Sequence, residues 1–150
     1  MAGCRTCELQ ARRDRGGAPD WDAIVRTEAW DVVHCDATSV LGWTVLLLRR
    51  HVAAVADLTD GEAAALGPLV RDVSRALHEI CGCEKTYVVQ FAEHPQHRHV
   101  HVHVIPRAPD LPDGRRGPGI FSLLGVPDAE RVGEDDMNAF AAALRGALGE

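Results

Sequence analysis

Residues 98–107 have the sequence RHVHVHVIPR, and this stretch decides the fold. Three histidines alternate strictly with three valines in it, in the order His99, Val100, His101, Val102, His103 and Val104. Successive side chains of a strand point to opposite faces, so the three imidazoles share one face and the valines cover the other. The pattern predicts a strand whose valine face packs on the core of the protein.

The histidine face can serve more than one purpose. At about 3.3 Å per residue, His99 and His103 are about 13 Å apart along the strand. Because Zn–N bonds are about 2.0–2.1 Å long, one ion cannot easily hold all three imidazoles. The face could be a polar, half-exposed surface or a metal site formed by two neighbours. It could also use uncharged imidazole near neutral pH as nucleophile, proton donor or phosphate ligand. We favour this last interpretation because no other polar residue type alternates with the valines.

Further strands are predicted on both sides of this segment. Apolar and β-branched runs indicate strands over 30–35, 43–51 and 86–93, and residues 45–48 are apolar on both faces, as in a central strand. Residues 108–119 are rich in proline and glycine and predict a loop. Residues 134–148 predict a closing helix, with acidic side chains at its N-terminus.

The main helix is predicted over residues 59–82. Thr59 and Glu62 form a capping box, and Gly82 is a plausible stop. Pro68 removes one helical hydrogen bond, so a kink near Gly67, or a helix that starts there, is expected.

The predicted fold class is therefore α+β. An antiparallel β-sheet meander carries one main helix packed on it, with terminal helices. We expect a single domain over 1–150, with its core at about 4–107 and with the Pro/Gly-rich loop and C-terminal helix in 108–150.

Composition limits the partners and the compartment. The chain has 150 residues, 46% of them hydrophobic, and a net charge of -6, which argues against a nucleic-acid partner. No segment approaches the ~20 apolar residues that span a bilayer, and the N-terminus lacks the apolar core of a signal peptide, so we expect a cytoplasmic protein without a membrane partner. The odd number of cysteines, 5, then suggests thiols or metal ligands rather than disulfides.

The motif HVHVHVI at 99–105, followed by Pro106 and Arg107, resembles the signature of the histidine triad superfamily of nucleotide hydrolases and transferases. The segment GWTVLLLRRHVAAVADLTD at 42–60 is similar to the family's segment before its capped helix, so the resemblance covers about residues 4–107. It implies that His101 is the nucleophile that attacks the α-phosphorus of a nucleotide, and that His103 contacts the phosphate. It also implies a homodimer and no cofactor in the chemistry.

Other site residues follow from the same resemblance. Asp36 is placed where the family often holds a carboxylate for the ribose hydroxyls, and Gln90 lies near its usual polar strand-end residue. Gln96 stands in HPQ at 94–96, in place of the family's G-Q-[ST]. Trp43 replaces a histidine, and Leu48 replaces a proline; indole could stack on a base or close the pocket.

Cys4 and Cys7 form a CxxC pair, which alone could be a redox pair, half of a zinc site, or idle thiols. Many bacterial proteins of the resembled family begin in a similar way. There the two cysteines complete a structural zinc site whose histidines correspond to His51 and His99. A closed Cys2His2 set suits a structural ion, and it gives His99 a role in the metal site as well as in the triad.

The expected function is hydrolysis of a phosphoramidate, a dinucleoside polyphosphate or a related nucleotide through a nucleotidyl-histidine intermediate. Two alternatives stay open. One is a nucleotidyltransferase or phosphorylase of the same superfamily. The other is a catalytically weak module that binds a nucleotide or zinc.

Overall fold

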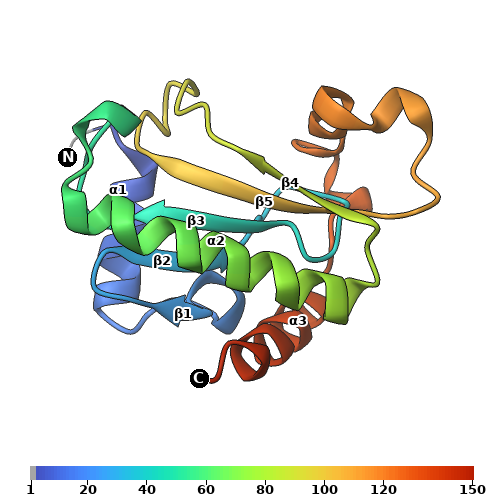
Figure 1. The fold of residues 1–150 in the computed structure, drawn as a ribbon, viewed down its shortest axis with the longest axis horizontal. Helices are drawn as coiled ribbons and strands as arrows, with labels where there is room; N and C mark the ends of the chain where they lie inside the picture. The colour runs from blue at the N-terminus through green and yellow to red at the C-terminus, as the bar shows by residue number, and fades with distance from the viewer. Residues whose placement is uncertain (1–2) are drawn as a thin grey trace.

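A five-stranded antiparallel sheet forms the centre of the computed structural model, which describes residues 3–150 (Figure 1). The strands lie in the order β1-β2-β3-β5-β4. Their bounds are β1 Val25–Arg26, β2 Trp30–His34, β3 Thr44–Leu48, β4 Lys85–Val89 and β5 His101–Arg107. The predicted α+β class is confirmed. The two-residue strand β1 was not predicted, because it is too short to show an alternating pattern.

The meander holds for β1, β2 and β3 and is then interrupted by the helix α2, Asp60–Cys81. The chain returns from α2 to the edge of the sheet as β4 and only then fills the gap as β5. In this register His103 lies opposite Val45 on one side and Val89 on the other. The histidine strand is therefore an interior strand, held in place by backbone hydrogen bonds along both edges.

β5 begins at His101, so His99 and Val100, which were predicted in the strand, precede it. The valines of 100–104 still pack on the main core, as the alternation predicted. α2 and α3, Glu134–Ala147, cover this face of the sheet. The core joins apolar residues of the strands to residues of both helices: Trp30, Val32, Leu46, Leu48, Val100, Val102, Val104, Val73, Leu77, Phe140 and Leu144. The histidines are thereby turned to the opposite face.

The main helix has the predicted ends. Thr59 and Glu62 form the capping box, and Gly82 ends the helix in the left-handed conformation with φ 60°. The helix is continuous through Pro68, so a start near Gly67 is wrong. A proline removes one backbone donor, and here the capped first turn and the packing of Leu69 and Val70 on the core outweigh that loss.

The opposite face carries α1, Arg5–Asp14, and the segment after β5. The predicted loop and the residues that follow it up to α3 contain three short 3-10 helices: η3 Asp113–Arg115, η4 Gly117–Leu123 and η5 Asp128–Glu130. η4 packs Ile120, only 1% exposed, against a second apolar cluster formed by Val33, Trp43, Val45, Leu47 and Ile105. This segment is therefore an ordered cover of the histidine face. Within residues 3–150, no helix is long and apolar enough to cross a membrane.

Candidate functional site

Two cysteines and two histidines converge where α1 meets the start of β5. The Sγ atoms of Cys4 and Cys7 and the Nδ1 atoms of His51 and His99 all lie within 4.8 Å of one another. The contacts between neighbours range from 3.1 Å, between the two Nδ1 atoms, to 3.6 Å, between Cys4 Sγ and His99 Nδ1. Tetrahedral zinc with bonds of about 2.0–2.3 Å would place its ligands roughly 3.3–3.8 Å apart. The four residues predicted as a metal site have the geometry of one.

His99 is oriented for this cluster by the backbone. Its Nε2 contacts the carbonyl oxygen of Leu48, which can only accept, so the proton lies on Nε2 and the lone pair on Nδ1 faces the cysteines. Outer contacts of this type fix the tautomer of a metal-binding histidine. Burial, aided by the neighbouring Cys4 thiol, raises the pKa of Cys7 to about 11. A thiolate at this place therefore needs a cation beside it.

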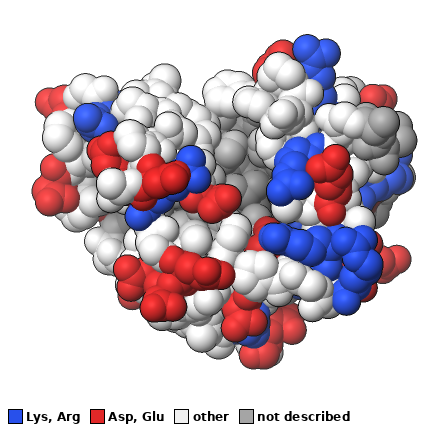
Figure 2. All heavy atoms as spheres, turned by 180° about the vertical axis from the view of Figure 1, so that it is seen from behind, with Lys and Arg blue, Asp and Glu red and all other residues white. Residues whose placement is uncertain are grey.

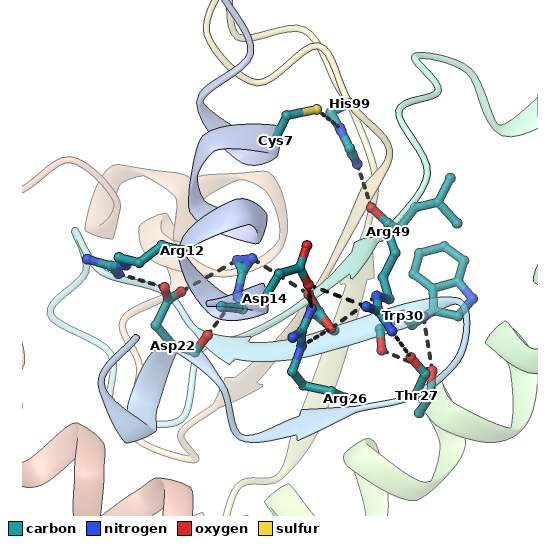
Figure 3. A network of polar contacts seen from close by, with 12 residues as sticks. Cys7, Arg12, Asp14, Asp22, Arg26, Thr27, Trp30, Arg49 and His99 are labelled. Atoms are coloured by element: carbon teal, nitrogen blue, oxygen red, sulfur yellow. Dashed lines mark hydrogen bonds and ion pairs between the residues drawn. The ribbon is translucent and has the colours of Figure 1, made fainter. Parts of the chain in front are cut away.

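α1 is attached to the sheet by a buried charge network (Figure 3). The guanidinium of Arg13 is fully buried, 3.6 Å from the Asp22 carboxylate and 3.7 Å from the Asp31 carboxylate. Arg26 donates to Asp31 at 2.9 Å. Because the same helix carries Cys4 as its N-cap and Cys7 in its first turn, this network places the cysteines beside His99.

His101 has its lone pair free on the side away from the backbone. Its Nδ1 lies 2.7 Å from the carbonyl oxygen of His99, so Nδ1 carries the proton and Nε2 is the unprotonated nitrogen. Burial lowers the pKa of His101, and the positive charge that His94 can carry lowers it further, while the His99 carbonyl raises it. The side chain is half-buried, and its ring centroid lies 5.1 Å from that of His103.

His103 is nearly buried, and its Nδ1 accepts a hydrogen bond from Trp43 Nε1 at 3.0 Å. The side chain of Trp43 has no exposed surface. It therefore offers no face for a nucleobase to stack on in this conformation, and its polar contact is with the triad. Phe121 of η4 lies edge-on to both rings, at 5.4 Å from each.

The loop before the triad is held by α1. Thr6 Oγ1 lies 2.9 Å from His97 Nδ1, and the backbone N–H of Arg5 donates to the carbonyl of Gln96 at 2.8 Å. The ring of His97 lies 6.3 Å from that of His101. The loop, which lacks the usual glycine and hydroxyl, is thus supported from a helix.

The remaining predicted site residues lie at the edges of this face. Asp36 follows β2 and is exposed, and Gln96 is also exposed. Gln90 follows β4, and its Oε1 is buried with no hydrogen-bond partner among the described residues. Thr6, Phe121 and Arg13 were not predicted, because each acts through a tertiary contact that no local pattern shows.

The face of the molecule away from α2 is hollowed between two lobes (Figure 2). Because α2 covers the valine face of β5, the hollow lies on the histidine side of the sheet. The triad imidazoles project from this side of the sheet.

The chain resembles known proteins closely in its fold and only weakly in its amino-acid sequence. No known family profile matches the chain. No curated protein matches it by sequence. Among solved structures, a histidine triad protein from Sinorhizobium meliloti 1021 is 26% identical, with a TM-score of 0.65 over 89% of this chain and 91% of that chain.

Two further structures are similar. A Zn-bound histidine triad family protein from Mycobacterium smegmatis is 20% identical, with a TM-score of 0.63 over 97% of this chain and 93% of that one. A hypothetical histidine triad nucleotide-binding protein from Sulfolobus tokodaii is 15% identical, with a TM-score of 0.70 over 95% and 92%. These similarities define an α+β protein with the histidine triad fold. The HVHVHVI motif, whose last five residues lie on β5, resembles the signature of the histidine triad superfamily.

Proposed function

We propose that the protein is a nucleotide hydrolase that acts through a covalent nucleotidyl group on His101. The observation that carries the proposal is the contact between His101 Nδ1 and the His99 carbonyl. It leaves Nε2 as a lone pair on a rigid interior strand, at the hollowed face. A nucleophile held in this way loses little freedom on reaching attack geometry.

In the first step, the Nε2 lone pair attacks the α-phosphorus of the nucleotide, and a P–N bond forms. The bond from phosphorus to the leaving group breaks, and the leaving group departs with the electron pair and takes up a proton. In the second step, water attacks the same phosphorus and releases the nucleoside monophosphate and the free imidazole. Dividing one displacement into two lowers the largest barrier.

Substrate binding is assigned to residues around this nucleophile. His103 would contact the phosphate, and Asp36 the ribose hydroxyls, while Gln90 begins the loop that precedes β5 and Gln96 lies within it. The support is the resemblance in the motif, together with the description of the similar Sulfolobus tokodaii protein as nucleotide-binding. A phosphoramidate, a dinucleoside polyphosphate or a related nucleotide is the proposed substrate class.

Mass spectrometry of the intact protein tests the covalent step. Wild type incubated with a nucleoside phosphoramidate and quenched without acid should gain one nucleotidyl group, which peptide mapping should place on His101. His101→Asn should lose the adduct, and His78→Asn, a control on α2, should keep it. An adduct elsewhere, or full turnover by His101→Asn, would contradict the proposal.

If phosphate or another acceptor discharged the adduct faster than water does, the transferase alternative would be supported instead. Nucleotide binding with no adduct would support the binding module.

We further propose that the four-residue cluster holds one structural zinc ion. The ligand set and its spacing fit tetrahedral zinc, and a similar protein is zinc-bound. Cys4, Cys7, His51 and His99 would hold the ion and thereby tie the N-terminus of α1 to β5. The ion has no part in the chemistry at His101. A reducing cytoplasm, which keeps cysteines as free thiols, is the proposed compartment.

Elemental analysis of purified protein tests the zinc site. About one zinc per chain is expected in the wild type and in the control variant Cys83→Ser, whose cysteine lies outside the cluster. Cys7→Ser should lose most of the metal. Equal zinc content in Cys7→Ser and wild type would remove this cysteine from the site.

A homodimer through β4 is the third part of the proposal. β4 is an edge strand, so its outer backbone groups are open to another strand, and Val88 on it is 52% exposed. Antiparallel pairing of β4 with the β4 of a second copy gives a two-fold interface. Light scattering after size exclusion should show a dimer for wild type and for the control Val55→Arg. Val88→Arg should shift it towards monomer, and a dimer unaffected by this change would exclude β4 as the interface.

A further inference from the structure

Trp43 and His103 form a buried polar pair on the histidine face. The indole Nε1 lies 3.0 Å from His103 Nδ1, and the exposed fractions of the two side chains are 0% and 7%. The two rings are nearly perpendicular, at 83°. Because the indole is buried away from water, its N–H donates to His103 and not to solvent.

The pair has only one possible direction. An indole N–H is a donor and has no acceptor atom, so His103 Nδ1 must accept. A neutral imidazole carries a single proton, which therefore lies on Nε2. Protonation of Nδ1 would set two donors against each other. Burial, aided by the charge that His101 can carry, already lowers the pKa of His103 to about 3.

We propose that Trp43 is a positioning residue that locks His103 in the Nε2–H tautomer, so that His103 donates to the substrate phosphate and cannot accept a proton from it. This inference rests on the proposed function only for the identity of the ligand. It distinguishes this chain from one with histidine at position 43. An imidazole at this position could donate or accept a hydrogen bond and so pass a proton on from His103. Indole can only donate, so it cannot take a proton from His103.

The surroundings hold the indole in this orientation. Gly42, with φ 93°, turns the chain into β3, and a Cβ at this position would lie 2.7 Å from Cys81 Sγ. The carbonyl of Trp43 accepts from Cys35 N, and its ring is covered edge-on by Phe121. The backbone at Trp43 is therefore held by the residue that follows β2, the preceding turn packs on the end of α2, and the ring itself is covered by η4. The end of α2, through Cys81, and the region after β5, through Phe121 of η4, therefore both help to position Trp43.

The decisive experiment is nuclear magnetic resonance of the 15N-histidine-labelled protein at pH 7. Long-range 1H–15N spectra distinguish protonated from unprotonated ring nitrogens, and His103→Gln assigns the signals. Wild type should show His103 with an unprotonated Nδ1 and a protonated Nε2. The Trp43 indole N–H should exchange slowly with solvent. A protonated Nδ1 in wild type overturns the proposal without any variant.

Trp43→Phe then removes the donor while keeping an aromatic ring. Both tautomers of His103 should become populated, and Trp43→His, which can donate, should restore the Nε2–H form. The signals of His34, which lies on the other face, report whether each variant is folded. An unchanged His103 tautomer in folded Trp43→Phe overturns the proposal.

Kinetics separate this inference from the proposed function. The rate of adduct formation should fall about twofold or more in Trp43→Phe, because only the molecules with the Nε2–H tautomer keep a donor aligned with the developing charge. Binding of AMP should change less than threefold, and Trp43→His should recover most of the rate. If wild type has the predicted tautomer but forms no adduct, the hydrolase proposal fails and the positioning role stands. If the adduct forms on a His103 with Nδ1–H, the positioning role fails alone.

Discussion

The two faces of the sheet hold their helices by different interactions. On one face, α2 and α3 pack through apolar side chains such as Leu77 and Phe140. On the other face, α1 is held by Arg13 between two aspartates and by the Cys/His cluster. Apolar burial depends little on protons or metal, whereas ionic and ligand contacts depend on both. The face that carries the triad imidazoles is therefore the one that responds to solution conditions.

The largest expected effect comes from breaking the charge network. Arg13→Met leaves Asp22 and Asp31 buried without this partner, and removing one member of a buried pair costs about 3–5 kcal/mol. Urea unfolding should show this loss. Arg71→Met, which removes an exposed ion pair, should change stability by less than about 1 kcal/mol. Equal effects of the two changes would show that Arg13 does not hold α1.

The apolar face should be weakened by a cavity instead. Leu77 is fully buried between α2 and the sheet, so Leu77→Ala should lower the free energy of unfolding by about 2–5 kcal/mol. The matched control is Leu41→Ala, whose side chain is 47% exposed. Measuring the free energy of unfolding at two pH values tests the contrast between the two faces further. The loss in Leu77→Ala should be similar at pH 5.5 and 7.5, and a strong pH dependence would contradict the contrast between the faces.

Acid should act on the histidine face first. Burial lowers the pKa of five histidines, four on that face and one on the other: His97, His99, His101, His103 and His34. Between those lowered values and about 6.5, the unfolded chain binds more protons than the folded chain. This part of the stability is complete above about pH 6.5 and is lost as the pH falls.

Hydrogen exchange followed by mass spectrometry can locate that loss. Between pH 7 and pH 5, after correction for the intrinsic exchange rate, α1 and residues 90–99 should lose protection before α2 does. Loss of protection in α2 first would reverse the assignment.

The smallest effect is expected at the cap of α2. Thr59→Ala removes the hydroxyl that accepts from Glu62 N, and such a change costs about 1 kcal/mol. The thermal midpoint should fall by a few degrees. Ser39→Ala, at an exposed loop position without a cap, serves as the control, and an equal fall in both variants would remove the capping box from the stability of the helix.

Local patterns predicted much of this fold. The strict alternation at 99–104 predicted the faces of β5, and Thr59, Glu62 and Gly82 predicted the ends of α2. In the sheet, β5 lies between β3 and β4, so the strands are not in chain order. Local patterns could not predict this order, because it depends on how α2 crosses the sheet. The 3-10 helices of 108–133 were also missed, since their order comes from tertiary contacts such as that of Ile120 with Ile105.

The site shows the same division. The spacing of histidines and cysteines and the family resemblance indicated Cys4, Cys7, His51 and His99, and the structure brings these four together. The environment of Trp43 was not predictable, because burial and hydrogen-bond partner are set by residues such as Phe121, far along the chain. Sequence identified the groups that can do chemistry, and the fold was needed to assign their protons.

The position of β5 between β3 and β4 has a consequence for synthesis on the ribosome. β3 is apolar on both faces and is made about fifty residues before its partner β5. Until residue 107 has emerged, the edge of β3 that will pair with β5 is open, and the run Val45 to Leu48 is a strand edge prone to pair with other chains. Pairing across such a sequence separation is also slow. The nascent chain therefore passes through an aggregation-prone stage that ends only when the histidine strand docks.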